Sequence, residues 1–276
     1  MQSASEIQFV DAHTHVHFVA FDEDREEVFA RAKEAQVGMI LVGTQKDTSA
    51  AAVLLAESHD NVYATVGLHP IHTSKSFHDT KELGEGGKEF TSRGEDFDTA
   101  NYGALAKNPK VVGIGECGLD YYRLEEETKK RQHETFIAQI ELANRLQKPL
   151  MLHIRQAYQD ALQILRTHAK VQGDVHFFAG TWEEAKQFLE LGFTLSFTGV
   201  VTFARDYDEV IRNAPLESLL SETDAPYVTP LPFRGKRNEP IHVREVVKQI
   251  ARIRGEDEEK VRAALLQNAR RVFNLA

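Results

Sequence analysis

Short apolar runs alternate with stretches of helical periodicity along most of the chain. Eight such runs of two to five residues lie at 7–10, 39–42, 62–66, 111–114, 150–152, 175–178, 193–197 and 219–220. Many of their residues are β-branched or aromatic, and they do not alternate strictly with polar residues. This pattern is typical of parallel strands that are buried on both faces. We therefore expect eight parallel strands.

The stretches between these runs have the spacing of amphipathic helices. Apolar residues recur at intervals of three and four in 128–146 and again in 258–273. Thr181 and Glu184, three residues apart, form the pattern of a capping box that opens another helix. Strands that alternate with helices pair in parallel through right-handed crossovers. Eight such units in 276 residues predict a (β/α)8 TIM barrel, for which about 250 residues is typical.

One segment interrupts the alternation. Residues 75–101 show little apolar periodicity and carry several glycines and many alternating charges. We interpret them as a long inserted loop after the third strand of a single 1–276 barrel domain. The loop is expected to be solvated, and either partly disordered or built around a short helix. The alternative is a lid, because loops after barrel strands rise from the catalytic face.

Charge and composition narrow the function further. The chain carries 42 acidic residues against 33 Lys and Arg, a formal net charge of -9, which argues against a surface that holds nucleic acid along many phosphates. The one cysteine, Cys117, cannot form an intramolecular disulfide. Neither a secretory signal nor an apolar stretch long enough to span a membrane is visible. We expect a cytoplasmic protein without membrane contact or an obligate protein partner.

Candidate chemistry begins at the end of the first apolar run, in the sequence Asp-Ala-His-Thr-His at 11–15. Residues two apart on a strand point to the same face, so His13 and His15 should converge in the barrel mouth with Asp11 just below them. Neutral imidazoles directed at one point make half of a metal site. Taken alone, this pattern fits a pair of hydrogen-bonded core histidines equally well.

Further potential metal ligands lie in or just after four later runs, namely Glu116, His153, His176 and Asp224. In a barrel these positions share the rim on which catalytic residues lie. Four histidines and two carboxylates can hold two divalent ions if one carboxylate bridges them, and such a centre is net positive and attracts an anion. Each residue also has a structural interpretation, as a strand-end carboxylate or a core histidine. Six such coincidences are improbable, which favours a metal site.

Six segments carry a resemblance to a known family: FVDAHTH at 9–15, GLHP at 67–70, GIGECGLDY at 113–121, KPLMLHIR at 148–155, ETDAPY at 222–227 and RNEP at 237–240. In this order they resemble the TatD family of metal-dependent deoxyribonucleases, which have amidohydrolase-type barrels. The resemblance implies two divalent ions per subunit, Mg²⁺, Mn²⁺ or Zn²⁺. It places His13, His15, Glu116 and Asp224 around one ion. Glu116 then bridges to a second ion, held by His153 and His176.

The resemblance also implies hydrolysis of a phosphodiester by an activated water. Glu116 and Asp224 are the expected catalytic residues, with Asp224 taking the proton of the attacking water. We expect Arg155 to contact phosphate, whereas Arg123 and Arg237 fit phosphate contact and surface salt bridging equally well. His69, at the end of the third strand, is expected to contact the substrate.

The sequence departs from the family at two places. His176 is followed by Phe-Phe-Ala-Gly at 177–180 where the family often has a cysteine and a small polar residue, and the insertion at 75–101 is longer than usual. The wall of the pocket and the access of substrate are therefore expected to differ.

The leading functional hypothesis is an exonuclease that acts on single-stranded ends of DNA, and on RNA ends as well. A dinuclear cationic pocket can bind a terminal phosphate even in an acidic protein. The alternative is a dinuclear-metal amidohydrolase or lactonase that acts on a small molecule. A bridging carbamylated lysine is common in those enzymes, but Lys148 lies before its strand and Glu116 already fills the bridging role. A metal-storing or scaffold protein is a third alternative, which an open metal site lined by arginines does not favour.

Overall fold

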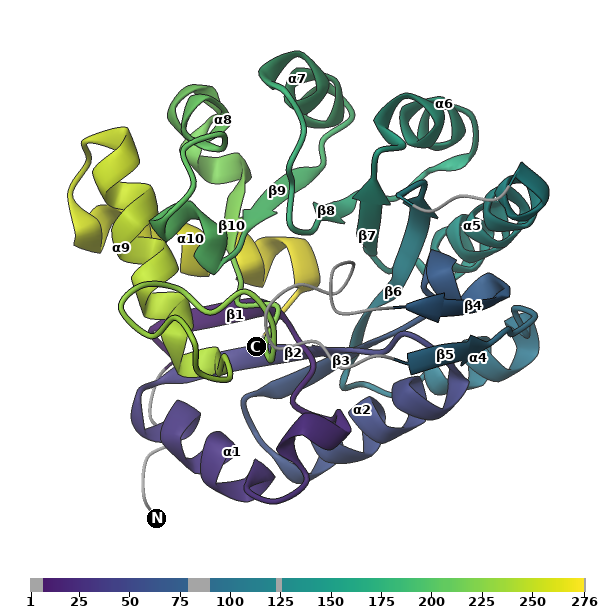
Figure 1. The fold of residues 1–276 in the computed structure, drawn as a ribbon, viewed down its shortest axis with the longest axis horizontal. Coiled ribbons are helices and arrows are strands. Elements are labelled where there is room, and N and C mark those ends of the chain that lie inside the picture. The colour runs from purple at the N-terminus through teal and green to yellow at the C-terminus, as the bar shows by residue number, and fades with distance from the viewer. Residues whose placement is uncertain (1–6, 79–89, 123–125, 276) are drawn as a thin grey trace.

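A computed structural model describes residues 7–78, 90–122 and 126–275. At its centre lies a sheet of eight parallel strands that is ringed by helices (Figure 1). In sheet order the strands are β1 (Phe9–Thr14), β2 (Val37–Val42), β3 (Val62–Val66), β6 (Val111–Asp120), β7 (Leu150–Arg155), β8 (Gly173–Val175), β9 (Thr194–Phe197) and β10 (Leu219–Ser221). All eight predicted runs contribute to a strand, and the predicted (β/α)8 barrel is confirmed.

The two edges of this sheet meet where β1 and β10 end. Thr14 forms a parallel bridge with Ala225. The amide of Asp224 donates a hydrogen bond to the carbonyl oxygen of His13 at 2.9 Å, and the amide of His15 donates to that of Ala225 at 2.8 Å. The first and last strands are therefore joined directly beside the predicted metal ligands.

Helices cover the outside of the barrel. They are α1 (Arg25–Glu34), α2 (Lys46–Ser58), α4 (Thr99–Leu105), α5 (Glu126–Leu146), α6 (Tyr158–His168), α7 (Trp182–Glu190), α8 (Asp208–Asn213), α9 (Val243–Arg254) and α10 (Glu258–Phe273). Short 3-10 helices span Val19–Phe21, Pro70–Thr73, Gly199–Thr202, Leu216–Ser218 and Pro240–His242. The capping box predicted before α7 is confirmed: the amide of Glu184 donates to the Thr181 hydroxyl oxygen, and the amide of Thr181 donates to the Glu184 carboxylate.

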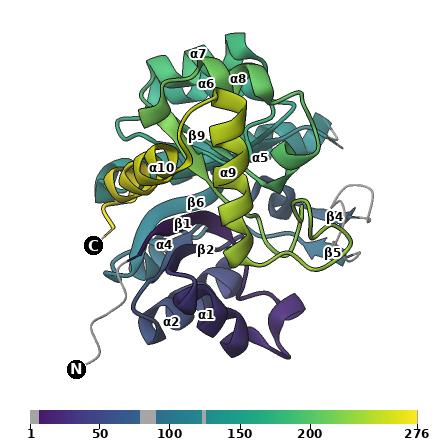
Figure 2. The ribbon, with the colours of Figure 1, turned by 90° about the vertical axis from the view of Figure 1, so that its left-hand side faces the viewer.

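The last helix, α10, closes one end of the barrel. Its residues Leu266, Ala269 and Phe273 are buried in one apolar cluster with Val10 of β1 and Met151 of β7. Figure 2 shows α10 at the end of the barrel opposite to β4 and β5. The apolar half of the interior is thus sealed from water at this end, and the polar strand ends face the other.

The segment predicted to be a solvated loop contains two strands. Lys75–His78 (β4) pairs antiparallel with Phe90–Arg93 (β5), and helix α4 begins at Thr99 within the predicted range. Residues 79–89 of the insertion lie outside the described part of the chain. The expectation of a loop with a short helix missed the strands because each has only four residues, too few for an alternating pattern to stand out among charged neighbours.

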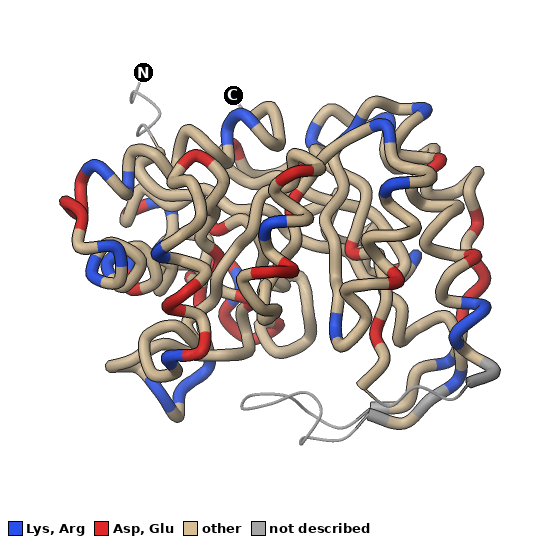
Figure 3. Tube along the Cα trace, turned by 90° about the horizontal axis from the view of Figure 1, so that it is seen from above, with Lys and Arg blue, Asp and Glu red and all other residues tan. Residues whose placement is uncertain are grey.

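Opposite charges lie close together on the outer surface. Figure 3 shows Lys and Arg interspersed with Asp and Glu along the described trace. Within one helix, for example, Lys248 Nζ lies 2.7 Å from Glu245 Oε1. None of the helices in the described residues is both long enough and apolar enough to cross a bilayer.

Candidate metal centre

The register of β1 determines which of its polar residues reach the barrel mouth. Asp11 is paired with Met39 but Thr14 with Leu41, so the pairing shifts between these positions and strict two-residue alternation is broken. Asp11 was expected just below the histidine pair, and its Oδ1 lies 3.4 Å from the amide nitrogen of His13. Its carboxylate accepts hydrogen bonds from Thr223, at 2.8 Å from the amide and 2.6 Å from the hydroxyl. Asp11 ties β1 to the segment after β10.

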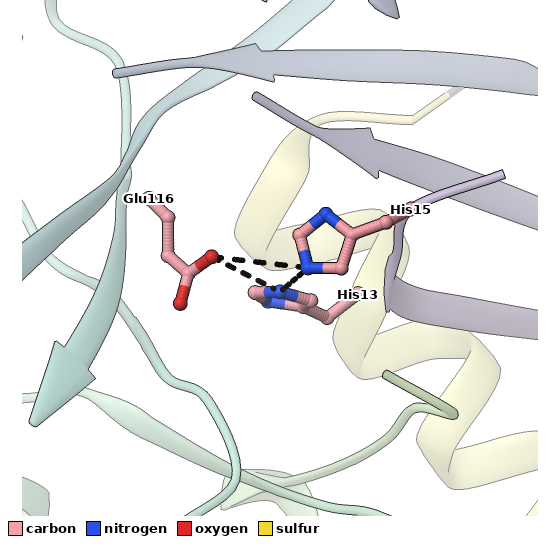
Figure 4. Close-up of side chains that lie close together, drawn as sticks. All are labelled: His13, His15 and Glu116. Atoms are coloured by element: carbon pink, nitrogen blue, oxygen red, sulfur yellow. Dashed lines mark hydrogen bonds and ion pairs between the residues drawn. The ribbon is translucent and has the colours of Figure 1, made fainter. Parts of the chain in front are cut away.

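His13 and His15 do converge, as predicted. Their Nε2 atoms lie 3.2 Å apart, and Glu116 Oε2 lies 3.5 Å from the first and 3.9 Å from the second. Figure 4 shows the two rings and the carboxylate directed toward one another from β1 and β6. Asp224 Oδ1 is 3.8 Å from His13 Nε2 and 3.4 Å from His15 Nε2. The structure thus brings together the four residues expected around one ion.

The other oxygen of Glu116 faces a second group of histidines. Oε1 lies 3.0 Å from His153 Nδ1, 3.2 Å from His176 Nε2 and 3.3 Å from His69 Nε2. His69, predicted as a substrate contact, therefore lies in the same group as the two predicted ligands. A carboxylate whose two oxygens each face a separate set of imidazoles has the arrangement needed to bridge two cations.

The donor atoms fit divalent metal ions. His13, His15 and Glu116 offer ligand atoms within 4.8 Å of one another, and so do His69, Glu116 and His153. His15 Nδ1 lies 2.9 Å from the carbonyl oxygen of Val42, a hydrogen bond that assigns the proton to Nδ1 and leaves the Nε2 lone pair facing the cluster. Imidazole nitrogens and carboxylate oxygens together suit Zn²⁺, Mn²⁺ and similar ions.

Charge states in the cluster favour cation binding. Burial alone would raise the pKa of Glu116, but His69, His13 and His176 around it hold that pKa well below its ordinary value. Burial lowers the pKa of His13, and burial together with His153 lowers the pKa of His69 to about 4. At neutral pH Glu116 is therefore ionised and His13 and His69 are neutral, the forms that bind metals. Burial would lower the pKa of His153 and of His176, but nearby carboxylates raise both, Asp120 and Glu116 for His153 and Glu222 and Glu116 for His176.

Two buried carboxylates behind the histidines were not predicted as site residues. Asp120 Oδ2 lies 2.9 Å from His153 Nε2, and Glu222 Oε1 lies 3.3 Å from His176 Nδ1. Glu222 is itself held by Ser196, whose hydroxyl donates to Oε2 at 2.8 Å. Carboxylates behind metal-binding histidines fix the orientation and proton position of the ring. The signal available in the sequence was an acidic residue two to four positions from a predicted ligand.

Close approach of β6 and β7 depends on glycine. Gly118 has φ +143°, and a Cβ atom there would lie only 2.0 Å from the carbonyl oxygen of His153. Any other residue would force the two strands apart. The separation of His153 from Glu116 and Asp120, which both come from β6, is therefore set by the backbone.

The arginines predicted to contact substrate lie in different surroundings. The guanidinium of Arg155, at the end of β7, stacks 3.8 Å from the centre of the Tyr122 ring. The guanidinium of Arg237 donates two hydrogen bonds of 2.7 Å to the carboxylate of Asp24, the arrangement expected from its salt-bridge alternative. Arg123 lies outside the described residues.

Replacement of Asp120 by asparagine is expected to weaken metal binding by roughly 10- to 100-fold, because His153 loses the carboxylate that orients it. Calorimetric titration of the metal-free variant with Mn²⁺ and Zn²⁺ measures the effect. Asp96→Asn, on an exposed carboxylate, serves as the matched control. Unchanged affinity in Asp120→Asn would show that His153 needs no support from this carboxylate.

Comparisons with known proteins show which family the chain belongs to. The family model described as TatD related DNase matches residues 10–274. A protein of Bacillus subtilis, YabD, described as an uncharacterized metal-dependent hydrolase, is 37% identical over 270 residues, which cover 96% of this chain and 98% of that protein. A protein of Erwinia tasmaniensis, described as 3'-5' ssDNA/RNA exonuclease TatD, is 35% identical over 266 residues. These residues make up 92% of this chain and 95% of that protein.

The solved structures include a similar fold. The crystal structure of YjjV, a TatD homolog from Escherichia coli K12, superposes with a TM-score of 0.83 at 29% identity, over 98% of this chain and 99% of that one. The family match spans all eight strands and every residue of the metal centre. The chain therefore belongs to the family of TatD related DNases.

Proposed function

We propose that this protein is a metal-dependent exonuclease that hydrolyses phosphodiester bonds at single-stranded ends of DNA and RNA with two divalent ions. The observation that carries the proposal is the position of Glu116, whose Oε2 faces His13 and His15 while its Oε1 faces His153 and His176. The relative from Erwinia tasmaniensis supports the substrate class, because it is described as a 3'-5' ssDNA/RNA exonuclease.

Glu116 and Asp224 have different roles in the proposed reaction. When bound, the metal ions supply an activated water and neutralise charge on phosphoryl oxygens. Glu116 would hold both ions, because each of its oxygens faces a different group of histidines. Asp224, whose side chain is 13% exposed, reaches the mouth beside His15 and accepts the proton of the attacking water. Burial would raise the pKa of Asp224, but His15 and His13 hold it below its ordinary value, so the carboxylate is free to accept a proton.

Two more residues have a proposed role toward the substrate. His69 is neutral at pH 7 and faces the same oxygen of Glu116 as His153 and His176, where it can complete the second ion's shell or contact a phosphoryl oxygen. Arg155 follows His153 by two residues and brings a guanidinium to the same rim, suited to phosphate oxygens.

A lysine-bridged amidohydrolase centre receives no support from the geometry. The ammonium group of Lys148 donates a hydrogen bond to the carbonyl of Val111, the first residue of β6. Glu116 lies further along the same strand, toward its carboxyl end. Lys148 is thus held at the opposite end of the strand from the cluster of histidines.

The proposal is tested with chelator-treated protein and single-stranded DNA and RNA of one sequence, each labelled at either the 5′ or the 3′ end. We expect no digestion without metal and a ladder of products that shorten from one end after Mg²⁺, Mn²⁺ or Zn²⁺ is added. A duplex of the same sequence with blunt ends is expected to be digested more slowly. Intact oligonucleotides under every metal would overturn the proposal.

A further inference from the structure

Most of the strongly exposed apolar side chains in the described residues belong to the end of the barrel that carries the metal centre. In the described residues, the large apolar side chains with the highest exposure are Val19, Leu54, Phe77, Tyr122, Phe203 and Leu231. Leu54 lies on the outer helix α2, and the other five lie in segments that follow the carboxyl ends of strands.

Two of these residues are aromatic rings stacked with arginine, and we call them the rim aromatics: Tyr122, 36% exposed, and Phe203, 38% exposed. The guanidinium of Arg155 lies 3.8 Å from the Tyr122 ring centre, and that of Arg234 lies 4.0 Å from the Phe203 ring centre. Each pair thus presents a flat apolar surface beside a fixed positive charge.

Both rim aromatics lie in segments that follow the carboxyl ends of barrel strands, the end at which the metal centre lies. Tyr122 follows β6, and its amide donates a hydrogen bond of 2.9 Å to Asp120, the carboxylate that contacts His153. Phe203 follows the short helix after β9. Its neighbour Thr202 accepts a hydrogen bond from the amide of Leu231, so that the segments after β9 and β10 are joined. Both residues thus belong to the end of the barrel that a substrate strand approaches.

Single-stranded nucleic acid is bound by this combination of groups elsewhere in proteins. Unpaired bases stack on aromatic rings and on guanidinium planes, while the charge attracts phosphate, and neither contact depends on the base. In a protein of net charge -9, stacking supplies binding that a basic groove would otherwise provide. In a duplex the bases are already stacked and are not available to the rings.

We propose that Tyr122 and Phe203 stack on unpaired bases behind the terminal nucleotide and so select single-stranded over paired substrate. This inference rests on the proposed exonuclease function and adds to it the residues that would bind the strand away from the scissile phosphate. The ligand of the rim aromatics is the substrate strand itself.

The test compares two oligonucleotides of equal length, one with normal bases and one with abasic residues at the second to fourth positions from the digested end. Wild-type protein is expected to digest the normal strand with roughly tenfold higher kcat/KM than the abasic one, the effect of losing about one base stack. In Tyr122→Ala and Phe203→Ala the ratio should fall toward one, mainly through KM. Tyr122→Trp and Phe203→Trp should restore it.

The ratio separates stacking from general damage, because both strands are measured on the same variant. Leu54→Ala, which removes an exposed apolar residue from α2, should leave the ratio at its wild-type value. If wild-type protein digests both strands equally, or if the alanine variants keep the ratio, the inference is wrong. If wild-type protein hydrolyses neither the strands nor a chromogenic phosphodiester without bases, the proposed function itself has failed.

Discussion

Replacing Glu116 with alanine is expected to lower nuclease activity by about a thousandfold or more. Both of its oxygens face groups of histidines, so its loss removes a ligand from each half of the centre at once. Bound metals supply several kcal/mol of transition-state stabilisation, and each 1.36 kcal/mol corresponds to a factor of ten in rate.

End-labelled oligonucleotide digestion measures the rate, and mass spectrometry of the dialysed protein measures the metal content. Glu116→Gln keeps the shape of the side chain and isolates the contribution of its charge. Glu209→Gln, an exposed position on α8, serves as the control for loss of one carboxylate. If Glu116→Ala retained both its metals and its activity, neither the bridging role nor the proposed chemistry could stand.

Asp224→Asn is expected to reduce kcat by roughly 10²- to 10⁴-fold, the range for loss of a general base. Asp224 lies in the left-handed backbone region, with φ +53°, which Asp and Asn tolerate better than most residues. Asparagine therefore preserves the turn and the hydrogen bond from the residue 224 amide to His13. It removes the negative charge that accepts a proton and faces the Nε2 atom of His15 at 3.4 Å.

The measurement is kcat over a range of pH at saturating metal, together with the unfolding midpoint. A variant that folds normally and binds metal but turns over slowly supports the role as base. Asp206→Asn, an exposed residue before α8, provides the matched control. Wild-type turnover in Asp224→Asn would assign the proton transfer to another group.

Much of the fold and the centre of the site could be predicted because they depend on pattern and topology. The apolar run at 62–66 became β3 with the same bounds, and Thr181 caps α7 as its spacing indicated. Parallel barrel strands end on one rim, so ligand residues at strand ends, such as Glu116 and His153, had to approach one another. That inference needs no knowledge of side-chain conformation.

The remaining features depend on register and side-chain orientation, which the pattern does not specify. The hydrogen bonds between Asp11 and Thr223, for example, join residues 212 positions apart in the sequence. Asp120 is the last residue of a strand that extends beyond its predicted end, and only its observed direction shows that it supports His153. Likewise, both interpretations of Arg237 were compatible with its charge until its contacts with Asp24 were seen.

The closing of the barrel by its first and last strands has a consequence for synthesis of the protein on the ribosome. His13 and His15 emerge early, whereas Asp224 follows them by about two hundred residues, and α10 emerges later still to cover the apolar interior. Contacts so distant in sequence form slowly, and an incomplete sheet exposes an apolar edge in the meantime. The nascent chain therefore cannot complete its metal centre until nearly all of it has been translated.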